Sequence, residues 1–160
     1  MTIYHGSTDI VRTPRIIRAY TGRDFGAGFY TTEILDQAVK WAARQARYRN
    51  RTDAFLNIYD LDDSALRKLN ILDFKDYSME WLDFVVACRH DADYRHNYDL
   101  VTGKIANDDV GETIQAVVDG LTSKEFALSK LVFMHANCQT CFSTENALQY
   151  LTFKSAERVN

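Results

Sequence analysis

The sequence has few of the features that mark secreted, disulfide-bonded or membrane-spanning proteins. Its 160 residues include one proline and three cysteines, and no apolar run approaches the roughly 20 residues that a membrane-spanning helix needs. The first residues lack a basic segment followed by a long apolar one, so we expect no secretory signal peptide. The cysteines are an odd set without the spacing of a disulfide framework: Cys88, Cys138 and Cys141. Together these absences predict a reduced, cytoplasmic protein with no membrane as a partner.

A strong charge of one sign, repeats and linker-like stretches are missing as well. The formal net charge is −3, so a strong overall attraction to nucleic acid or to an anionic membrane is not expected. Hydrophobic residues make up 46% of the chain and charged residues 26%, which are ordinary values for a globular protein with a core. We therefore predict a single domain that covers residues 1–160.

Basic residues nevertheless gather near the start of the chain, at Arg12, Arg15, Arg18 and Arg23. Solvated surface is the simpler interpretation of such a group, and a phosphate-binding cluster is the alternative.

Hydrophobic periodicity predicts a chain in which short strands and helices alternate. Segments rich in β-branched and aromatic residues predict strands at 2–7, 29–32, 54–61, 70–74, 99–103, 138–144 and 151–153. Apolar residues at helical spacing predict helices at 33–49, 64–69, 78–89, 109–118, 123–131 and 145–150. Thr32 is expected to cap the first of these helices, and Asn107 or Asp108 the fourth. The predicted fold class is therefore α+β.

Glycine is scarce, but three of the seven glycines lie close together, at Gly22, Gly26 and Gly28. Such a stretch can turn sharply and lie close to a ligand. It leads directly into the predicted strand at 29–32, so Tyr30 is displayed beside the loop.

Two motifs carry a family resemblance. The first is His5-Gly6 on the first predicted strand, and the second is the segment Phe25–Tyr30, which reads Phe-Gly-Ala-Gly-Phe-Tyr. Together they resemble the ADP-ribosyltransferase superfamily, above all the branch that includes the poly(ADP-ribose) polymerases and diphtheria-type toxins. Over nearly its whole length the chain also resembles a family of small bacterial proteins of unknown function within that superfamily. Gly22–Gly26 and Ile105–Val110 are hallmarks of that family.

The resemblance implies a fold of two packed antiparallel sheets that form an NAD cleft, with helices at the flanks. It implies that His5 bonds ribose hydroxyls of NAD, that the Gly6 backbone pairs with the nicotinamide carboxamide, and that Ser7 can hold the carboxamide oxygen. Tyr30 would stack on the nicotinamide ring. The other expected NAD contacts are Arg23, Phe25, Gly26, Gly28 and, on the helix, Trp41. Phe29 points away from Tyr30 and is expected in the core.

The third catalytic element of the superfamily is an acid on a late strand, usually glutamate. The matching strand here offers Gln139, which we take as the candidate catalytic residue beside His5 and Tyr30. A glutamine can exchange hydrogen bonds with ribose hydroxyls but cannot act as a general base. Glu145 and the pair Asp108-Asp109 are the nearest acidic substitutes in the sequence.

The resemblance thus implies transfer of ADP-ribose from NAD to a protein, nucleic acid or small nucleophile, with release of nicotinamide. By analogy the protein would be the toxin of a bacterial toxin–antitoxin pair, with a small antitoxin as partner. The alternative is a catalytically inactive module that binds NAD or another nucleotide. A nuclease that uses the basic segment 44–51 has little support, because no cluster of catalytic side chains accompanies it.

The remaining signals favour structure over chemistry. Cys138-x-x-Cys141 with His135 nearby suggests a metal site, but cysteines three apart on a strand face opposite ways, so we expect no bound metal. His90 and His96 bracket an acidic loop and are expected on the surface.

Overall fold

The computed structural model describes residues 1–18, 22–91, 93–106, 108–131 and 137–159. Within these ranges no helix combines the length and the apolar character that crossing a bilayer requires. The elements follow in the order β1 Thr2–Ser7, β2 Phe29–Thr31, α1 Leu35–Tyr48, β3 Phe55–Leu61, α2 Ala65–Lys68, β4 Ile71–Asp73, α3 Met79–His90, β5 Leu100–Lys104, α4 Asp108–Val118, α5 Lys124–Leu131, β6 Cys138–Phe142, α6 Glu145–Leu148 and β7 Leu151–Arg158. The α+β class is confirmed.

Two sheets organise these elements. The first has the order β1-β3-β7 and is antiparallel throughout, and the second has the order β2-β6-β5-β4. In the second sheet β6 pairs antiparallel with β2 and with β5, whereas β4 and β5 are parallel. The expectation that both sheets are antiparallel is therefore wrong for the pair β4 and β5. The connection from β4 to β5 contains α3, and a crossover of that length allows neighbouring strands to run in the same direction.

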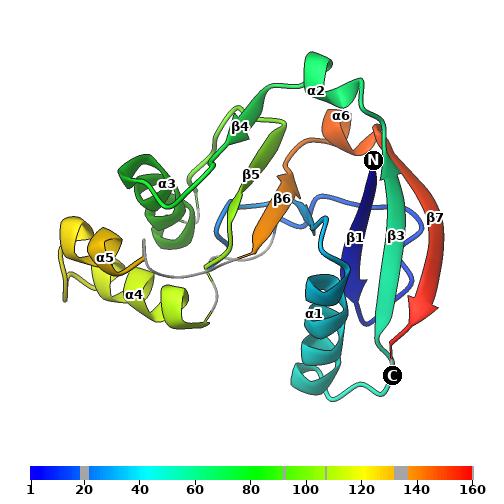
Figure 1. Cartoon of the computed structure of the whole chain (residues 1–160), viewed down its shortest axis with the longest axis horizontal. Coiled ribbons are helices and arrows are strands. Elements are labelled where there is room, and N and C mark those ends of the chain that lie inside the picture. Colours follow the sequence, from blue (N-terminus) through cyan, green and yellow to red (C-terminus); the bar gives the residue numbers. More distant parts are fainter. Residues whose placement is uncertain (19–21, 92, 107, 132–136, 160) are drawn as a thin grey trace.

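The two sheets meet at one isolated bridge between β1 and the end of β2. Tyr4 and Thr32 exchange both backbone hydrogen bonds, at 2.8 and 2.9 Å. Figure 1 shows β1 passing close to the end of β2 here, while the rest of the first sheet lies to one side. The bridge brings the first strand, with its His-Gly motif, against the strand that follows the glycine stretch.

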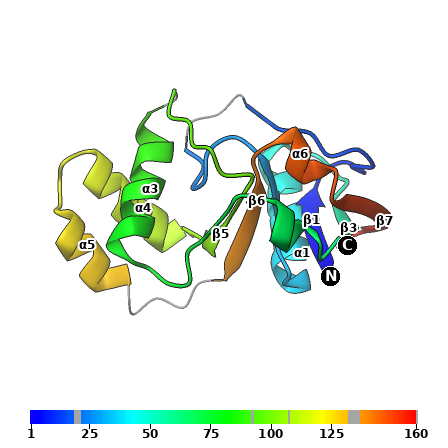
Figure 2. The same cartoon turned by 90° about the horizontal axis from the view of Figure 1, so that it is seen from above.

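Among the described residues the two larger hydrophobic clusters are one shared by both sheets and one between the second sheet and its helices. The shared core joins Phe29 and Phe142 of the second sheet to Ile3 and Tyr59 of the first, and the rings of Phe29 and Tyr59 meet edge to face at 5.6 Å. The other core lies between the second sheet and α3, α4 and α5, around the fully buried Trp81. Seen from above, these three helices gather on the far side of β5 and β6 from the first sheet (Figure 2).

Helix α1 covers the first sheet at very short range. Its buried stripe consists of the small residues Ala38, Ala42 and Ala46. A Cβ built on Gly6 of β1 would lie 2.1 Å from the backbone oxygen of Ala38, so only glycine permits this approach. The alanine stripe and the glycine therefore fix α1 against β1 and set the position of the His-Gly motif.

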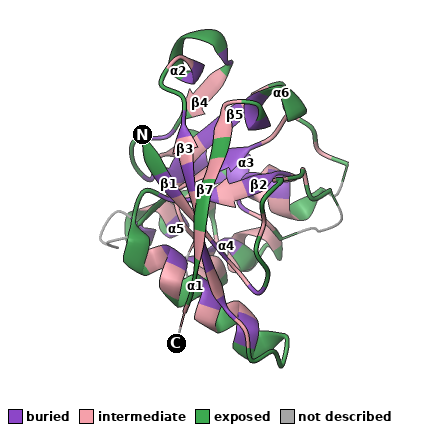
Figure 3. Ribbon diagram, turned by 90° about the vertical axis from the view of Figure 1, so that its right-hand side faces the viewer, coloured by how far each residue is buried: buried purple, intermediate pink, exposed green. Residues whose placement is uncertain are grey.

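Predicted boundaries differ from the observed ones at a few ends. The hydroxyl of Thr32 accepts a hydrogen bond from the Ile34 N–H at 3.1 Å, yet α1 begins only at Leu35. β7 continues to Arg158, beyond the predicted end at 153. The prediction stopped short because the last residues of the strand are mostly polar and exposed and show no apolar pattern. Figure 3 shows a similarly exposed α2 at one end of the molecule. Of the two predicted caps of the fourth helix, Asn107 lies outside the described residues, and the side chain of Asp108 is not described.

Candidate functional site

His5 is held in a single tautomer by its contact with the neighbouring strand. Its Nδ1 lies 2.7 Å from the carbonyl oxygen of Tyr30, and its ring lies 4.3 Å from that of Phe29. A carbonyl only accepts hydrogen bonds, so Nδ1 carries the proton. Burial lowers the pKa of His5 from 6.5 to about 4, against the opposing effect of the Tyr30 carbonyl and with help from the charge of Arg23. At neutral pH Nε2 is thus a free acceptor, and among the described residues it has no partner.

Gly6 presents backbone groups at the edge of β1 that faces β2. Tyr4 directs its N–H and C=O towards Thr32, and residues two apart in an antiparallel strand point to the same edge. The N–H and C=O of Gly6 therefore point past the end of the bridge, where a ligand amide can pair with them. Ser7 lies at the end of β1, and its hydroxyl accepts a hydrogen bond from the Asp9 N–H at 3.2 Å.

Tyr30 fastens the glycine stretch with its hydroxyl. The hydroxyl donates to the Gly26 carbonyl at 2.7 Å and accepts from the Phe25 N–H at 3.1 Å. Burial raises its pKa well above the usual value of 10, so the group stays protonated. The guanidinium of Arg23 lies 5.5 Å from the ring centroid and also donates to the Gly28 carbonyl at 3.3 Å. Any aromatic ligand that stacks on Tyr30 has to share this ring with Arg23.

Gly28 lies where the loop crosses β6. A Cβ at this position would lie 2.3 Å from the sulfur of Cys141 and 2.7 Å from the carbonyl oxygen of Phe142. The glycine therefore permits the close approach of the loop to β6, and with it the pairing of Tyr30 with Cys141.

The centre of the site is a residue that sequence reasoning did not single out. Asp24 is only 6% exposed, and one of its carboxylate oxygens accepts from both Nε and Nη2 of Arg89, at 2.9 and 2.5 Å. The other oxygen accepts from the Ala106 N–H at 2.9 Å and from Nε2 of Gln139 at 2.8 Å. Buried charges require such complete pairing. Asp24 thereby ties the glycine stretch to α3, to the segment after β5 and to β6.

A signal for this centre was present in the sequence. Asp24 belongs to the hallmark segment Gly22–Gly26, and Ala106 belongs to the hallmark segment Ile105–Val110. The hydrogen bond between them joins the two segments across 82 positions. Arg89, in contrast, occupies an ordinary position near the end of a helix, and nothing local marks it as a partner.

Gln139 has a fixed orientation because its partner is a carboxylate. A carboxylate cannot donate, so the amide must turn its NH₂ group towards Asp24. The carbonyl oxygen of Gln139 is left without a partner among the described residues. Gln139 can therefore accept a hydrogen bond from a substrate hydroxyl, but it cannot remove a proton.

The three predicted catalytic residues are connected through the glycine stretch. His5 contacts the backbone of Tyr30, the Tyr30 hydroxyl contacts Phe25 and Gly26, and Gln139 contacts Asp24. Tyr30 belongs to residues 24–30, and His5 and Gln139 each form one hydrogen bond to this stretch.

Two predicted NAD contacts lie apart from these residues. The side chain of Phe25 is fully buried between Phe74 and Phe84, so only its backbone reaches the site. Trp41 is 49% exposed on α1, with the guanidinium of Arg44 at 5.9 Å from its ring. Of the acidic substitutes, Glu145 is exposed in the first turn of α6, and the side chains of the aspartates at 108 and 109 lie outside the description.

The cysteines on β6 differ in their surroundings. Cys138 is exposed, whereas Cys141 is buried and its pKa is raised to about 11, mainly by burial. His135 lies outside the described residues. The described side chains contain no group of three or more histidine, cysteine, aspartate or glutamate residues that could hold a metal ion.

His96 is not the surface residue that was expected. Its ring lies 5.2 Å from Phe84, its Nε2 lies 3.3 Å from the Phe25 carbonyl, and its Nδ1 accepts from the Tyr98 N–H at 3.3 Å. Burial lowers its pKa. The acidic loop folds back onto the aromatic cluster of α3, and His96 fastens it to the glycine stretch.

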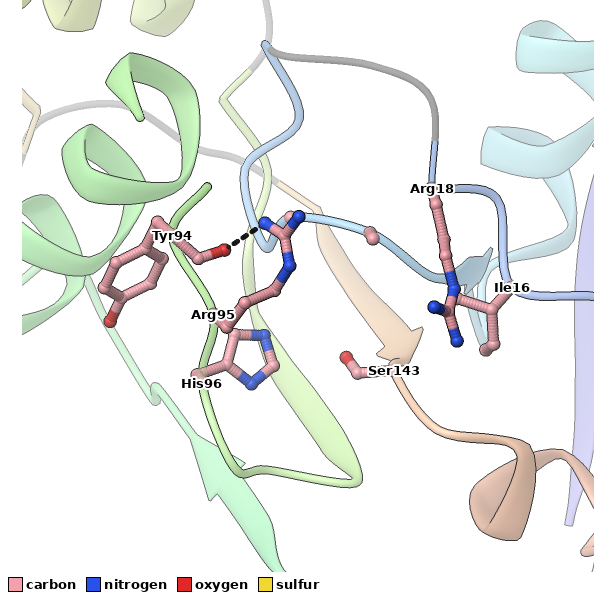
Figure 4. A pocket seen from close by; sticks show the side chains of 8 residues that line it. Ile16, Arg18, Tyr94, Arg95, His96 and Ser143 are labelled. Atoms are coloured by element: carbon pink, nitrogen blue, oxygen red, sulfur yellow. Dashed lines mark hydrogen bonds between the residues drawn. The ribbon is translucent and has the colours of Figure 1, made fainter. Parts of the chain in front are cut away.

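A pocket of about 220 Å³ lies between this loop and the segment before the glycine stretch. Figure 4 shows Ile16 and Arg18 on one side, Tyr94, Arg95 and His96 on the other, and Ser143 between them. Gly26 and Ala27 complete the lining.

Comparisons with known proteins place the chain without supplying a function. A family model described as "Protein of unknown function (DUF3990)" matches residues 1–153. Neither the curated proteins nor the solved structures contain a match.

Proposed function

The chain belongs to the DUF3990 family of proteins of unknown function, and we propose that it is an ADP-ribosyltransferase with an ADP-ribosyltransferase-like fold. It would transfer ADP-ribose from NAD to a nucleophile in the cytoplasm and release nicotinamide. One observation carries the proposal: the His5-Gly6 motif lies directly against the strand that ends the Gly26-x-Gly28-Phe29-Tyr30 motif. The Tyr4–Thr32 bridge and the 2.7 Å contact of His5 with Tyr30 join the two.

The residues at this junction suit the parts of NAD that they would hold. The backbone of Gly6 has no partner on this edge among the described residues and offers one donor and one acceptor, which matches a carboxamide. Nε2 of His5 is an acceptor at neutral pH and suits a ribose hydroxyl. The ring of Tyr30, held in place through its hydroxyl, suits stacking on nicotinamide.

Gln139 would orient the ribose and stabilise the charge that develops on it. In the reaction the glycosidic electron pair leaves with nicotinamide, and a lone pair of the acceptor forms the new bond to the ribose carbon. The carbonyl oxygen of Gln139 can accept from a ribose hydroxyl and place a negative dipole near the positive carbon. Asp24 is engaged by three groups and is no base. The acceptor proton therefore passes to water, and acceptors that need little activation are favoured.

The alternative is an inactive module that binds NAD or another nucleotide. The observation that favours it is the engagement of Gln139 with Asp24, which leaves the site without a free carboxylate among the described side chains. In both cases the acceptor and a small antitoxin partner are expectations from the resemblance alone.

Incubation with NAD distinguishes the active transferase from the inactive binding module. We expect the purified protein to release nicotinamide, measured by chromatography, and His5→Ala to abolish the release. His90→Ala is the matched control, since His90 is an exposed histidine at the end of α3. Calorimetric binding of NAD without release would favour the module. Neither binding nor release would contradict both.

A further inference from the structure

The outer side of α1 gathers cations and aromatic rings. Residues 40–51 include five lysines and arginines and no carboxylate, although the whole chain has a formal net charge of −3. Exposed residues along α1 are visible in Figure 3. The helix dipole favours cations in the last turn, but Lys40 lies in the second turn, so the dipole does not account for the whole set. Within this segment the exposed side chains of the helix are Lys40, Trp41, Arg44, Arg47 and Tyr48.

The two aromatic residues of this set are not part of the core. α1 packs on the first sheet through its alanine stripe, whereas Trp41 and Tyr48 are both exposed. They are seven residues apart, which is two helical turns, so they lie on the same side of the helix and about 10 Å apart along its axis. Their rings can therefore stack on flat groups of a ligand.

Cations lie between and beside these rings. Arg44 follows Trp41 by three positions and precedes Tyr48 by four, which makes it a neighbour of both on the helix surface. Its guanidinium lies 5.9 Å from the Trp41 ring centroid. Lys40 and Arg47 flank this row and form no ion pair with any residue that the structure describes. Rings and cations thus alternate along one side of the helix.

Acidic residues of this region lie at the ends of the row. The single acid of α1, Asp36, belongs to its first turn. Past the end of the helix, Arg51 forms an ion pair of 3.3 Å with Asp9 and so adds no net charge. The attraction for an anion is therefore centred between Lys40 and Arg47.

We propose that this side of α1 binds single-stranded nucleic acid. The cations attract the phosphates, and the exposed rings can stack on unpaired bases, which a duplex keeps stacked on one another. An acidic peptide would satisfy the cations but has no bases to stack on the rings, so the observations favour nucleic acid. At a spacing of about 3.4 Å per nucleotide the two rings are roughly three nucleotides apart, so one short strand can contact both.

The binding surface is separate from the junction that would hold NAD. α1 packs directly on Gly6 of the His-Gly motif, so a strand on its outer side lies about 10–12 Å away, the diameter of a helix with its side chains. Binding of the strand does not require cleavage of NAD. That the strand is also the acceptor of ADP-ribose rests on the proposed function.

The experiment is a fluorescence anisotropy titration at low salt with a labelled oligothymidylate of about ten nucleotides. We expect this strand to bind more tightly than a labelled duplex of the same length, and unlabelled polyglutamate to compete poorly. Intrinsic fluorescence gives a second readout. The chain has two tryptophans and Trp81 is fully buried, so quenching by the strand should come from Trp41 and disappear in Trp41→Ala.

Variants separate the rings from the cations. Trp41→Ala and Tyr48→Ala should each weaken binding by at least about fivefold. The double variant Lys40→Gln/Arg47→Gln should weaken binding and lower the slope of log affinity against log salt concentration by about 0.7 for each cation removed.

Matched controls come from other helices. Phe126→Ala removes an exposed ring from α5, and Arg67→Gln/Lys68→Gln removes the same two charges from α2, at the other end of the molecule from α1 (Figures 1 and 3). Both controls should keep wild-type affinity.

Four results would overturn the proposal. They are a wild type that does not bind the strand, a duplex that binds equally tightly, polyglutamate that competes as well as unlabelled strand, and ring variants that match Phe126→Ala. An oligouridylate titration identifies the sugar: tighter binding than the thymidylate assigns the site to RNA, and weaker binding assigns it to DNA. A protein that binds the strand but never cleaves NAD would retain this surface and lose the proposed function, and cleavage of NAD without binding would do the reverse.

Discussion

The side-chain amide of Gln139 donates a 2.8 Å hydrogen bond to the carboxylate of Asp24, which is 6% exposed. If the proposed function holds, this contact accounts for glutamine on the late strand, where the ADP-ribosyltransferase superfamily usually has glutamate. A glutamate here would place a second carboxylate beside a buried one. The neutral amide satisfies Asp24 and keeps one oxygen for a substrate.

Gln139→Glu tests this relationship. From the sequence alone the variant is expected to keep the fold, because the two side chains are nearly isosteric, but the neighbouring carboxylate should raise the pKa of the new glutamate. A carboxyl whose folded pKa exceeds its unfolded value of about 4.3 destabilises the protein as pH rises above that value. We expect the melting temperature of the variant to fall further below wild type at pH 8 than at pH 5.

Gln149→Glu, at an exposed position after α6, is the control and should show little pH-dependent deficit. A constant difference between Gln139→Glu and wild type across this pH range would show that the new carboxylate does not sense Asp24.

Tyr30→Phe should separate the hydroxyl from the ring. Loss of the hydroxyl removes two hydrogen bonds and leaves the Phe25 N–H without its acceptor, which should cost about 1–3 kcal/mol of unfolding free energy. The stacking surface survives, so Tyr30→Ala should weaken NAD binding more than Tyr30→Phe. Denaturant unfolding and calorimetry measure the two effects. Tyr48→Phe, 88% exposed, is the control. Equal losses of NAD affinity in both variants would contradict stacking.

His5 should make stability depend on pH in a defined window. Its pKa is about 4 in the folded protein against 6.5 for an ordinary histidine, so the unfolded chain binds the proton more readily. Its contribution to stability is complete above pH 6.5 and is lost as pH falls towards 4. His5→Gln should flatten this part of the stability profile relative to a His90→Gln control. An NMR titration in which the His5 ring titrates near 6.5 in the folded protein would disprove the assignment.

Gly6→Ala should destabilise the contact between α1 and β1. The added methyl would lie 2.1 Å from a backbone oxygen of the helix, so α1 has to shift, at a cost of about 1–3 kcal/mol or more. Gly111→Ala is the matched control. Its Cβ would lie at ordinary contact distances, 3.7 Å from the end of Arg89 and 4.0 Å from the backbone oxygen of Ala106. Alanine in a helix interior is favoured over glycine by about 0.5–1 kcal/mol. Similar melting temperatures for the two variants would contradict the close approach.

Local patterns in the sequence predicted the elements better than their partners. Alanine spacing indicated α1, and alternation separated the buried Phe29 from Tyr30, as the structure confirms. The local sequence does not mark Asp24, because its partners, Arg89 and Gln139, are 65 and 115 positions away. The motif wrongly predicts a ligand contact for the side chain of Phe25, because a motif does not show which of its side chains point into the core.

The loop 91–98 and the strand β4 show a second limit of sequence reasoning. A polar, acidic loop predicts solvent exposure, yet His96 is drawn in by the aromatic ring of Phe84. The direction of β4 depends on how α3 crosses back to β5, which periodicity along the chain does not encode.

The order of strands in the two sheets also determines when the protein can assemble. Among the described strands β2 pairs with β6, and the middle strand β3 of the first sheet needs β7 on one side, so both sheets join early segments to late ones. Before these contacts can form, long loops must close, and closing them costs conformational entropy. Folding is therefore slower than in proteins whose contacts are local. On a ribosome β1 and β3 can pair early, whereas β2 has to wait until β6 has been synthesised. The glycine stretch and Gln139 therefore come together late, and the site is among the last parts of the molecule to form.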